Sequence, residues 1–569
     1  MTLTVDDFIE SLPQKGRTRS PPSHKAWTRS ILDPGAPQYI LPEFALVDIY
    51  SNLFEVGGTP IQSRAHANRS FSDTLLSSLP DTASVPDLTL QGVSMREFVQ
   101  TYGDVVRAPE RKGKALPHYP IAPEFAYYSG IRQNDPNLLT SQLVPAIAAG
   151  GDSSLKTLDS FQKALGAATF SGPGGRRPND LLETIFDAIL RADGKQRATM
   201  APLSKIYQSL SGGSTPADQT FLKWTRPSPT DHPRTPAERL VLDLRRLSGY
   251  EPHLPRLDWV KWACAFVRTY VSLTCLWRTR AVVLVHQECD KILLGDASKR
   301  LGKDDLHDGL LGLREDDPPL LRANGEWTSQ IDILVQAYAE ARIAVNTILW
   351  LLSVADGLSV GVPADLESLP ESAILSEVRT THSPTKGLIS MPYDQTGWQC
   401  NELLDELQAR AAVLDSLAAR FGCANARNLV RQVIDSFPKY TSVSKATWAN
   451  NLREYVIYSL NPPRIDSTKD EYSLIRTWSG RGVRSGVKVI PAGGLLALLV
   501  QFVATDAKQH HTKPTLLDLT RLFQDLRVEF EPGPEGLGML IDKLGTLGLL
   551  EGSPDALLAA QIGAPYGHI

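Results

Sequence analysis

The stretches PTLLDLTRLFQDLR (514–527), PEGLGMLIDKLGTLGLL (534–550) and EGSPDALLAAQI (551–562) decide the fold expected for the end of this chain. In the first two, apolar residues recur at the three-to-four spacing of an amphipathic helix. The third holds the turn sequence Gly-Ser-Pro-Asp between apolar residues, which is typical of a hairpin. With a further helix expected over 493–505, this is the order of a winged helix-turn-helix, a module that binds duplex nucleic acid or another protein.

Each of the two helices has one broad apolar side and a clear end signal. Pro514 suits the first turn of the earlier helix. Gly548 suits the end of the later one, because glycine readily adopts the left-handed conformation that closes a helix. The residues expected to be buried are Leu516, Leu517, Leu519, Leu522, Phe523 and Leu526, followed by Leu537, Leu540, Ile541, Leu544 and Leu547.

The later helix would be the recognition helix, but its charges are unusual for that role. It carries Glu535 and Asp542, with Lys543 as its one cation. A helix in the major groove normally presents Arg, Lys, Asn or Gln to the base edges. Phosphate would repel the acidic side chains, so a partner protein and nucleic acid both stay open as the ligand of this module.

A glycine-rich basic run, RTWSGRGVRSGVKV, precedes the module. No Asp or Glu occurs from residue 472 to residue 505. Flexible backbone with guanidinium groups can follow a phosphate backbone, and a tryptophan can stack on a base or sugar. The candidate DNA-binding residues are therefore Arg476, Trp478, Arg481, Arg484 and Lys488, together with Lys543. The alternative is a basic surface hairpin that joins two domains, with Trp478 in a core.

The middle of the chain predicts a helical bundle. Four long segments repeat a helical apolar spacing: residues 259–294, 327–355, 400–421 and 448–460. Pro236 is well placed in the first turn of a helix that opens this block, and the Pro-Pro pair at 462 and 463 ends it. No repeat of fixed period is visible, which disfavours a solenoid.

These observations predict a mainly α, multidomain chain with a central helical bundle and a C-terminal winged helix-turn-helix. The expected parts are a basic arm rich in proline and serine (1–38), an irregular mixed N-terminal region (39–235), the bundle (236–463), and the arginine-glycine segment with the winged-helix domain (464–569). At 569 residues the chain is too long for a single core.

Composition points to an ordinary soluble protein of the cytoplasm. Hydrophobic residues make up 42% and charged residues 21%, and the formal net charge of −4 means that any nucleic-acid contact needs a local basic face. The chain has five cysteines and no CxxC pair, which argues against a disulfide framework and a cysteine-based zinc site. No signal peptide or membrane span is evident. We expect no metal and no cofactor.

Two short motifs suggest chemistry, and each has a simpler reading. His511, Lys513 and Asp518 have the HxK(x)4D spacing of phospholipase-D-type nucleases, in which histidine is the nucleophile. That chemistry needs two copies of the motif or a dimer, and the chain contains one copy. His286 and Glu288 resemble the HxE of zinc deaminases, but no PCxxC follows. The acidic run 304–317 is expected to be a solvated loop.

The end of the chain resembles the G component of bacterial DNA phosphorothioation-dependent restriction systems, which act in defence against phage. The resemblance covers about the last hundred residues: RGVRSGVKVIPAGGLLALLVQFV, LTRLFQDLRVEF and LGLLEGSPDA. It implies a non-catalytic subunit that acts on double-stranded DNA beside P-loop ATPase and helicase-like partners.

The sequence thus predicts an accessory or adaptor subunit of a DNA-directed defence complex, without enzyme activity of its own. A pure protein-interaction scaffold with a protein-docking winged helix is the alternative from another class. A transcription regulator, or a cryptic nuclease built on His511, Lys513 and Asp518, are further alternatives.

Overall fold

The structure is a computed structural model. It describes residues 3–12, 14–15, 18–22, 32–35, 55–56, 59–60, 107–111, 114–117, 142–143, 146–147, 154–169, 235–254, 256–311, 317–322, 327–381, 396–443, 448–460, 493–551 and 560–566. The described part is mostly helical, as the sequence predicts, and its strands are short two-stranded pairs. No helix in these ranges is long and apolar enough to cross a membrane.

The helical bundle follows a short helix, α8 (Ser154–Thr169). Its members are α11 (Pro236–Tyr250), α12 (Arg256–Leu293), α13 (Lys303–Leu311), α14 (Trp327–Gly357), α15 (Pro363–Glu367), α16 (Glu371–Thr380), α17 (Thr396–Arg420), α18 (Ala426–Asp435), α19 (Pro438–Thr441) and α20 (Trp448–Leu460), with 3-10 turns at Glu251–His253 and Ala297–Lys299. Thr235 and Glu238 form a capping box at the start of α11, with Pro236 in the first turn.

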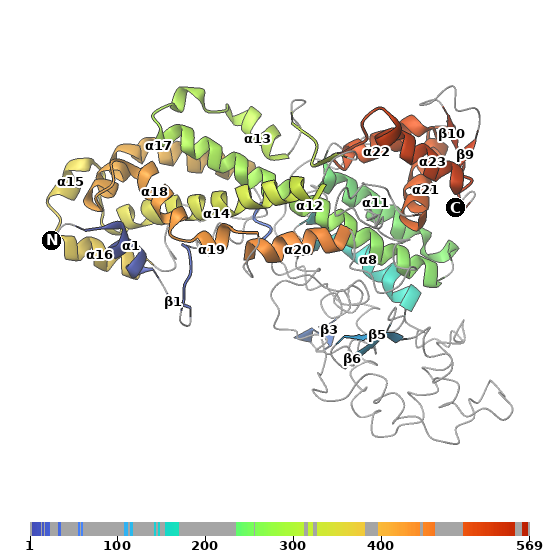
Figure 1. Ribbon diagram of the computed structural model, residues 1–569, viewed down its shortest axis with the longest axis horizontal. Coiled ribbons are helices and arrows are strands. Elements are labelled where there is room, and N and C mark those ends of the chain that lie inside the picture. Colours follow the sequence, from blue (N-terminus) through green and yellow to red (C-terminus); the bar gives the residue numbers. More distant parts are fainter. Residues whose placement is uncertain are drawn as a thin grey trace, which may run out of the picture.

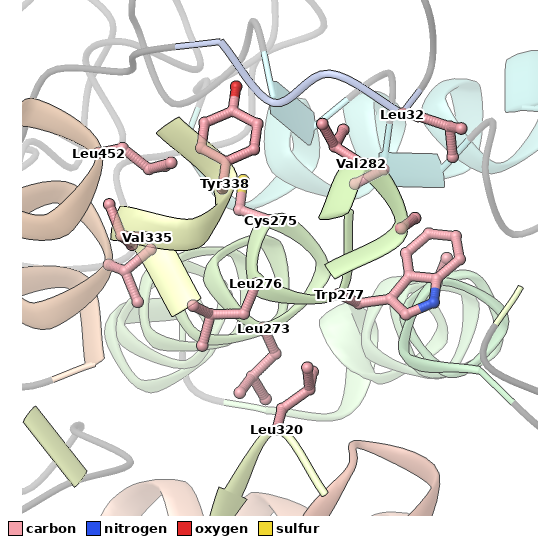
Figure 2. Packing of buried hydrophobic residues seen from close by; sticks show 14 of the residues in the cluster. Leu32, Leu273, Cys275, Leu276, Trp277, Val282, Leu320, Val335, Tyr338 and Leu452 are labelled. Carbon is pink, nitrogen blue, oxygen red and sulfur yellow. The ribbon is translucent and has the colours of Figure 1, made fainter. Parts of the chain in front are cut away.

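Helix α12 is the centre of this bundle. Residues 262–279, five turns of helix, are all buried, and a helix that is apolar on every side has to be surrounded. It packs against α14, α20, α11, α17, α13 and α8. Figure 2 shows this core, in which Leu273, Leu276 and Trp277 of α12 meet side chains from elsewhere in the chain.

The N-terminal part of the chain reaches the bundle in two places. Helix α1 (Val5–Ser11) packs against α16 and α18 at the end of the bundle far from the C-terminus (Figure 1). Residues 32–35, expected in an extended arm, are instead docked on α12 and α14. Leu32 is buried, and the carboxylate of Asp33 accepts hydrogen bonds from Arg342 at 3.0 Å and from the hydroxyl of Tyr338. Arg342 pairs with the carboxylate of Asp33 and Arg278 donates to its carbonyl, so these two cations of the bundle hold residues 32–35 in place.

The remaining strands are paired locally. β1 (Gln14–Lys15) pairs with β2 (Thr18–Arg19), β3 (Glu55–Val56) with β4 (Thr59–Pro60), and β5 (Arg107–Arg111) with β6 (Lys114–Pro117), all antiparallel. β7 (Leu321–Arg322) pairs in parallel with β8 (Val528–Glu529), so it joins the bundle to the end of the chain.

We call residues 493–566 the C-terminal unit. It contains α21 (Gly493–Gln509), α22 (Leu516–Asp525), β8, a π-helical turn (Pro534–Gly538), α23 (Met539–Thr546), β9 (Leu550–Glu551) and β10 (Gln561–Ile562). β9 and β10 pair antiparallel, and Thr515 forms a bridge to Gln561 on the other side of β10. The unit therefore combines three helices, α21, α22 and α23, with a small sheet. The order across the sheet is Thr515, β10 and β9, so β10 lies in the middle.

Several details of the sequence prediction for this unit need correction. α21 continues to Gln509 because no proline or glycine stops it at residue 505. Pro514 precedes the helix rather than opening it, because Thr515 is the N-cap of α22. Leu517 and Leu547, expected to be buried, are each 37% exposed. In the bundle, the first half of the expected acidic loop (304–317) is helical instead, because residues 304–311 belong to α13.

A buried set of charges joins the C-terminal unit to the bundle. We call Arg239, Asp243 and Arg246 of α11, with Asp506 of α21 and Asp525 of α22, the Arg239 network. Arg239 contacts Asp243 at 2.7 Å and Asp525 at 3.2 Å, while Arg246 contacts Asp243 at 2.7 Å and also Asp506. The hydroxyl of Tyr270 donates to Asp243 at 2.9 Å.

Aromatic and polar contacts continue this joint. The ring of Phe502 lies 5.8 Å from that of Tyr250 and 5.9 Å from that of Phe266. Trp262 of α12 packs edge-on against Tyr566, at 4.7 Å between the ring centroids. The amide of Leu320 donates to the carbonyl of Arg527 at 2.8 Å. In Figure 1 the C-terminal unit accordingly lies directly beside α11 and the start of α12.

Removal of Arg239 should destabilise the fold strongly. Arg239→Met removes the guanidinium partner of Asp525 and one of the two guanidinium partners of the fully buried Asp243. Breaking a buried ion pair typically costs about 3–5 kcal/mol. Urea denaturation measures this loss. Lys299→Met, which breaks a pair that is 70% and 49% exposed, is the control and should change stability by less than about 1 kcal/mol. Equal effects of the two substitutions would contradict this account.

The network also predicts a pH dependence. Two guanidinium groups face three carboxylates, and burial raises the pKa of Asp525 to about 7. Between pH 4 and 7 the folded protein holds a proton that the unfolded chain has released. The free energy of unfolding should therefore fall as pH rises through this window, by at most about 1.4 kcal/mol per pH unit.

Asp525→Asn should remove this part of the pH dependence, because the amide does not titrate. Urea denaturation at several pH values between 4 and 8 measures the slope. Asp296→Asn, at an exposed position, should leave the slope of the parent protein unchanged. An identical slope in the Asp525→Asn protein would show that this carboxyl does not titrate in the window.

Candidate functional site

Most of the residues predicted to contact DNA cannot be placed. Arg476, Trp478, Arg481, Arg484 and Lys488 lie outside the described residues. Their proposed contact with phosphate therefore stays a prediction.

Lys543 is described, and its surroundings weaken the case for a major-groove helix. It lies half-buried on α23, next to the exposed Asp542. The hydroxyl of Thr546 donates to the main-chain carbonyl of Asp542 at 2.7 Å, so it is occupied within the helix. The described polar face of α23 therefore presents one cation beside one anion. Their charges cancel, so this face has little net attraction for a phosphate backbone.

A concave site lies elsewhere in the C-terminal unit. We call it the C-terminal hollow. It has a volume of about 380 Å3 and lies between the end of α21, the segment that follows it, and strands β9 and β10. Its lining residues are Gln501, Ala504, Thr505, Lys508, His511, Thr512, Lys513, Pro514, Glu551, Gln561, Ile562, Gly563 and Ala564.

The hollow gathers cationic and imidazole groups. Residues 508–513, with the sequence KQHHTK, are all exposed and contain no acid. Among the described residues neither Lys508 nor Lys513 forms an ion pair; Lys513 donates to the amide oxygen of Gln561 at 3.2 Å. Glu551 is the one carboxylate of the lining. The sequence analysis missed this site, although a run of four basic or imidazole side chains without an acid was a visible signal.

The structure separates the members of the nuclease-like motif. His511 and Lys513 line the hollow, but Asp518 does not. Its carboxylate accepts hydrogen bonds from the amide of Thr515 at 2.9 Å and from the hydroxyl of Thr515 at 2.7 Å. The amide of Asp518 donates back to that hydroxyl at 3.3 Å. This is a capping box at the start of α22, so Asp518 has a structural task.

A second hollow, of about 520 Å3, lies within the bundle between α12, α14, α18 and α19. His286 lines it, and burial lowers the pKa of this histidine. Arg427 makes a two-point contact with Asp290, at 2.6 and 2.9 Å. Glu340, Arg431 and Asp435 complete its charged lining. Cations and anions nearly balance here, so the hollow favours no ligand class.

Glu288, the other member of the HxE motif, has its own partners. Its carboxylate accepts from the amide of Leu301 at 2.8 Å and from Lys291 at 2.6 Å. Within the described ranges, no three His, Cys, Asp or Glu side chains are grouped so that they could hold a metal ion. The five cysteines are all buried and free.

Comparison with known proteins adds no family. No protein-family model, no curated protein and no solved structure matches this chain. The resemblance noted in the sequence therefore stays a prediction.

The capping role of Asp518 can be tested. Asp518→Ala removes one half of the capping box and should lower the free energy of unfolding by about 1 kcal/mol. Urea denaturation measures this change. Gln524→Ala, at an exposed position on the same helix, should have a much smaller effect. A fully stable Asp518→Ala protein would mean that capping by this carboxylate contributes little to the stability of the fold.

Proposed function

We propose that the chain is a non-catalytic accessory or adaptor subunit of a bacterial, DNA-directed defence complex of the restriction type. In this proposal its C-terminal unit is a winged helix-turn-helix, and the unit contacts double-stranded DNA and a partner ATPase or helicase-like subunit. In this proposal the partner subunits carry out any enzymatic reaction on DNA.

The order of elements in the C-terminal unit carries this proposal. α21, the bridge residue Thr515, α22, α23, β9 and β10 follow one another as the helices and strands of a winged helix do, and Thr515 lies beside β10 as its first strand would. Modules of this type bind duplex DNA or protein.

The Arg239 network supports an adaptor role. A binding module linked by a flexible segment can turn freely, whereas this one meets the bundle through buried charges and stacked rings. A ligand held on the C-terminal unit would therefore have a defined orientation relative to the bundle. Such an arrangement suits a subunit that positions DNA against its partners.

Direct binding to duplex DNA tests the proposal. Fluorescence anisotropy with a labelled blunt duplex that has 5′-hydroxyl ends should give micromolar or tighter binding that weakens steeply with salt. Replacement of Arg476, Arg481, Arg484 and Lys488 by glutamine should weaken binding equally for all sequences. Each lost phosphate contact should reduce the slope of log affinity against log salt by about 0.9.

Lys299→Gln, which removes an exposed lysine of the bundle, is the matched control and should leave affinity and slope unchanged. Absence of binding by the parent protein, or an unchanged slope in the fourfold variant, would refute contact with DNA phosphates through this segment.

The second candidate function is a protein-interaction scaffold without DNA affinity. The described charges of α23 favour it, because Asp542 is exposed beside half-buried Lys543, and Leu547 next to them is 37% exposed. An exposed leucine at the end of a helix can anchor a protein partner. Leu547→Asp should then abolish copurification with a partner protein, and the parent protein should show no affinity for the duplex.

A further inference from the structure

The C-terminal hollow is separate from the surface that a winged helix uses for duplex DNA. No residue of α23 lines it. Gly563 and Ala564, which do line it, follow β10 at the end of the strand pair where Gly563 donates to the carbonyl of Leu549 at 2.9 Å. The recognition helix and the hollow can therefore hold different ligands.

Main-chain hydrogen bonds hold the backbone of the basic segment in position. The amide of Thr512 donates to the carbonyl of Ala507 at 2.8 Å, and the amide of His511 to that of Lys508 at 3.1 Å. On the opposite wall, the amide of Ile562 donates to the carbonyl of Pro514 at 3.0 Å. These bonds tie the segment that carries His511 and Lys513 to α21 at one end and to β10 at the other.

His511 lies at the turn that follows α21. Its φ of 55° is in the left-handed region, where histidine, asparagine and aspartate are enriched among the residues other than glycine. This turn places His511 in the lining of the hollow.

We propose that the C-terminal hollow binds the phosphomonoester of a nucleotide, with Lys508 and Lys513 as its cationic ligands and His511 as a hydrogen-bonding partner. The two ammonium groups match the charge of about −1.5 to −2 that a phosphomonoester carries at pH 7. A volume of about 380 Å3 is within the range of small-molecule sites. The nucleotide is the 5′ end of a nucleic-acid strand or a free mononucleotide. Glu551 opposes the bound anion.

A purely structural role accounts for part of this arrangement. Lys508 lies in the last turn of α21, where a cation offsets the partial negative charge of the helix end. Lys513 lies beyond the helix, after the reversal at His511, and its ammonium group points to Gln561 of the sheet. The dipole of α21 therefore accounts for the position of Lys508 but not for that of Lys513. A ligand bound by both ammonium groups accounts for the pair.

The test compares two oligothymidylates with a 3′ fluorescein, one with a 5′ phosphate and one with a 5′ hydroxyl. The full-length protein should bind the phosphorylated strand at least about tenfold more tightly, because charge-assisted hydrogen bonds to a phosphate are stronger than those to a neutral hydroxyl. In Lys508→Gln/Lys513→Gln this preference should disappear. His511→Asn, which tolerates the same backbone conformation, should reduce it, and Glu551→Gln should increase it.

Lys543→Gln is the control on α23 and should keep the preference, with circular dichroism confirming that each variant folds. Calorimetry with thymidine 5′-monophosphate distinguishes the sources. Binding of the mononucleotide shows a site for free nucleotides, whereas binding of the phosphorylated strand alone shows a site for strand ends.

Equal affinity for the two strands together with no heat from the mononucleotide would overturn the proposal. So would a preference that persists in the double lysine variant. Neither result depends on binding of the blunt duplex with 5′-hydroxyl ends, so the hollow and the proposed DNA contact can fail separately.

Discussion

Buried charge that must be compensated is the constraint on which the arrangement of this protein depends. The effective cost of removing an ion from water is several kcal/mol unless a partner and further hydrogen bonds replace the solvent. Arg239, buried on α11, meets this condition through Asp243 of its own helix and Asp525 of α22. The same logic holds Asp33 against Arg342 and Tyr338. The C-terminal unit and the docked N-terminal segment are thus positioned by the cations of the bundle, while apolar packing fills the space between them.

The sequence was sufficient to predict features that depend on residues close together in the chain. Three-to-four spacing predicts the long helices, because a buried helix needs apolar side chains at that period whatever its neighbours are. Cap chemistry is local too. Pro236 opens α11, and Gly548 has the positive φ of 67° expected for a residue that ends a helix. The helical character of the chain is therefore confirmed, whereas the winged-helix assignment and the domain boundaries stay predictions.

The sequence was insufficient where residues far apart in the chain meet. Arg239 and Asp525 are 286 positions apart, and nothing in either local pattern marks one as the partner of the other. The hollow shows the same limit, because its walls come from residues 501–514, from Glu551 and from residues 561–564. The motif of His511, Lys513 and Asp518 shows the limit of sequence spacing in another way. Spacing along the chain placed the three together, but the N-cap of α22 turns Asp518 to its own helix.

The distribution of charge in the C-terminal unit then separates two kinds of contact. If α23 were the main reader of DNA, its face should hold the cations, yet it offers Lys543 beside Asp542. Two further described cations of this unit, Lys508 and Lys513, lie in the concave C-terminal hollow, whose lining holds one carboxylate, Glu551. A hollow of this shape selects an end or a single nucleotide, since only these can be surrounded on several sides. Its chemistry therefore complements an adaptor that positions DNA, because recognition of a strand end and contact along a duplex need different surfaces.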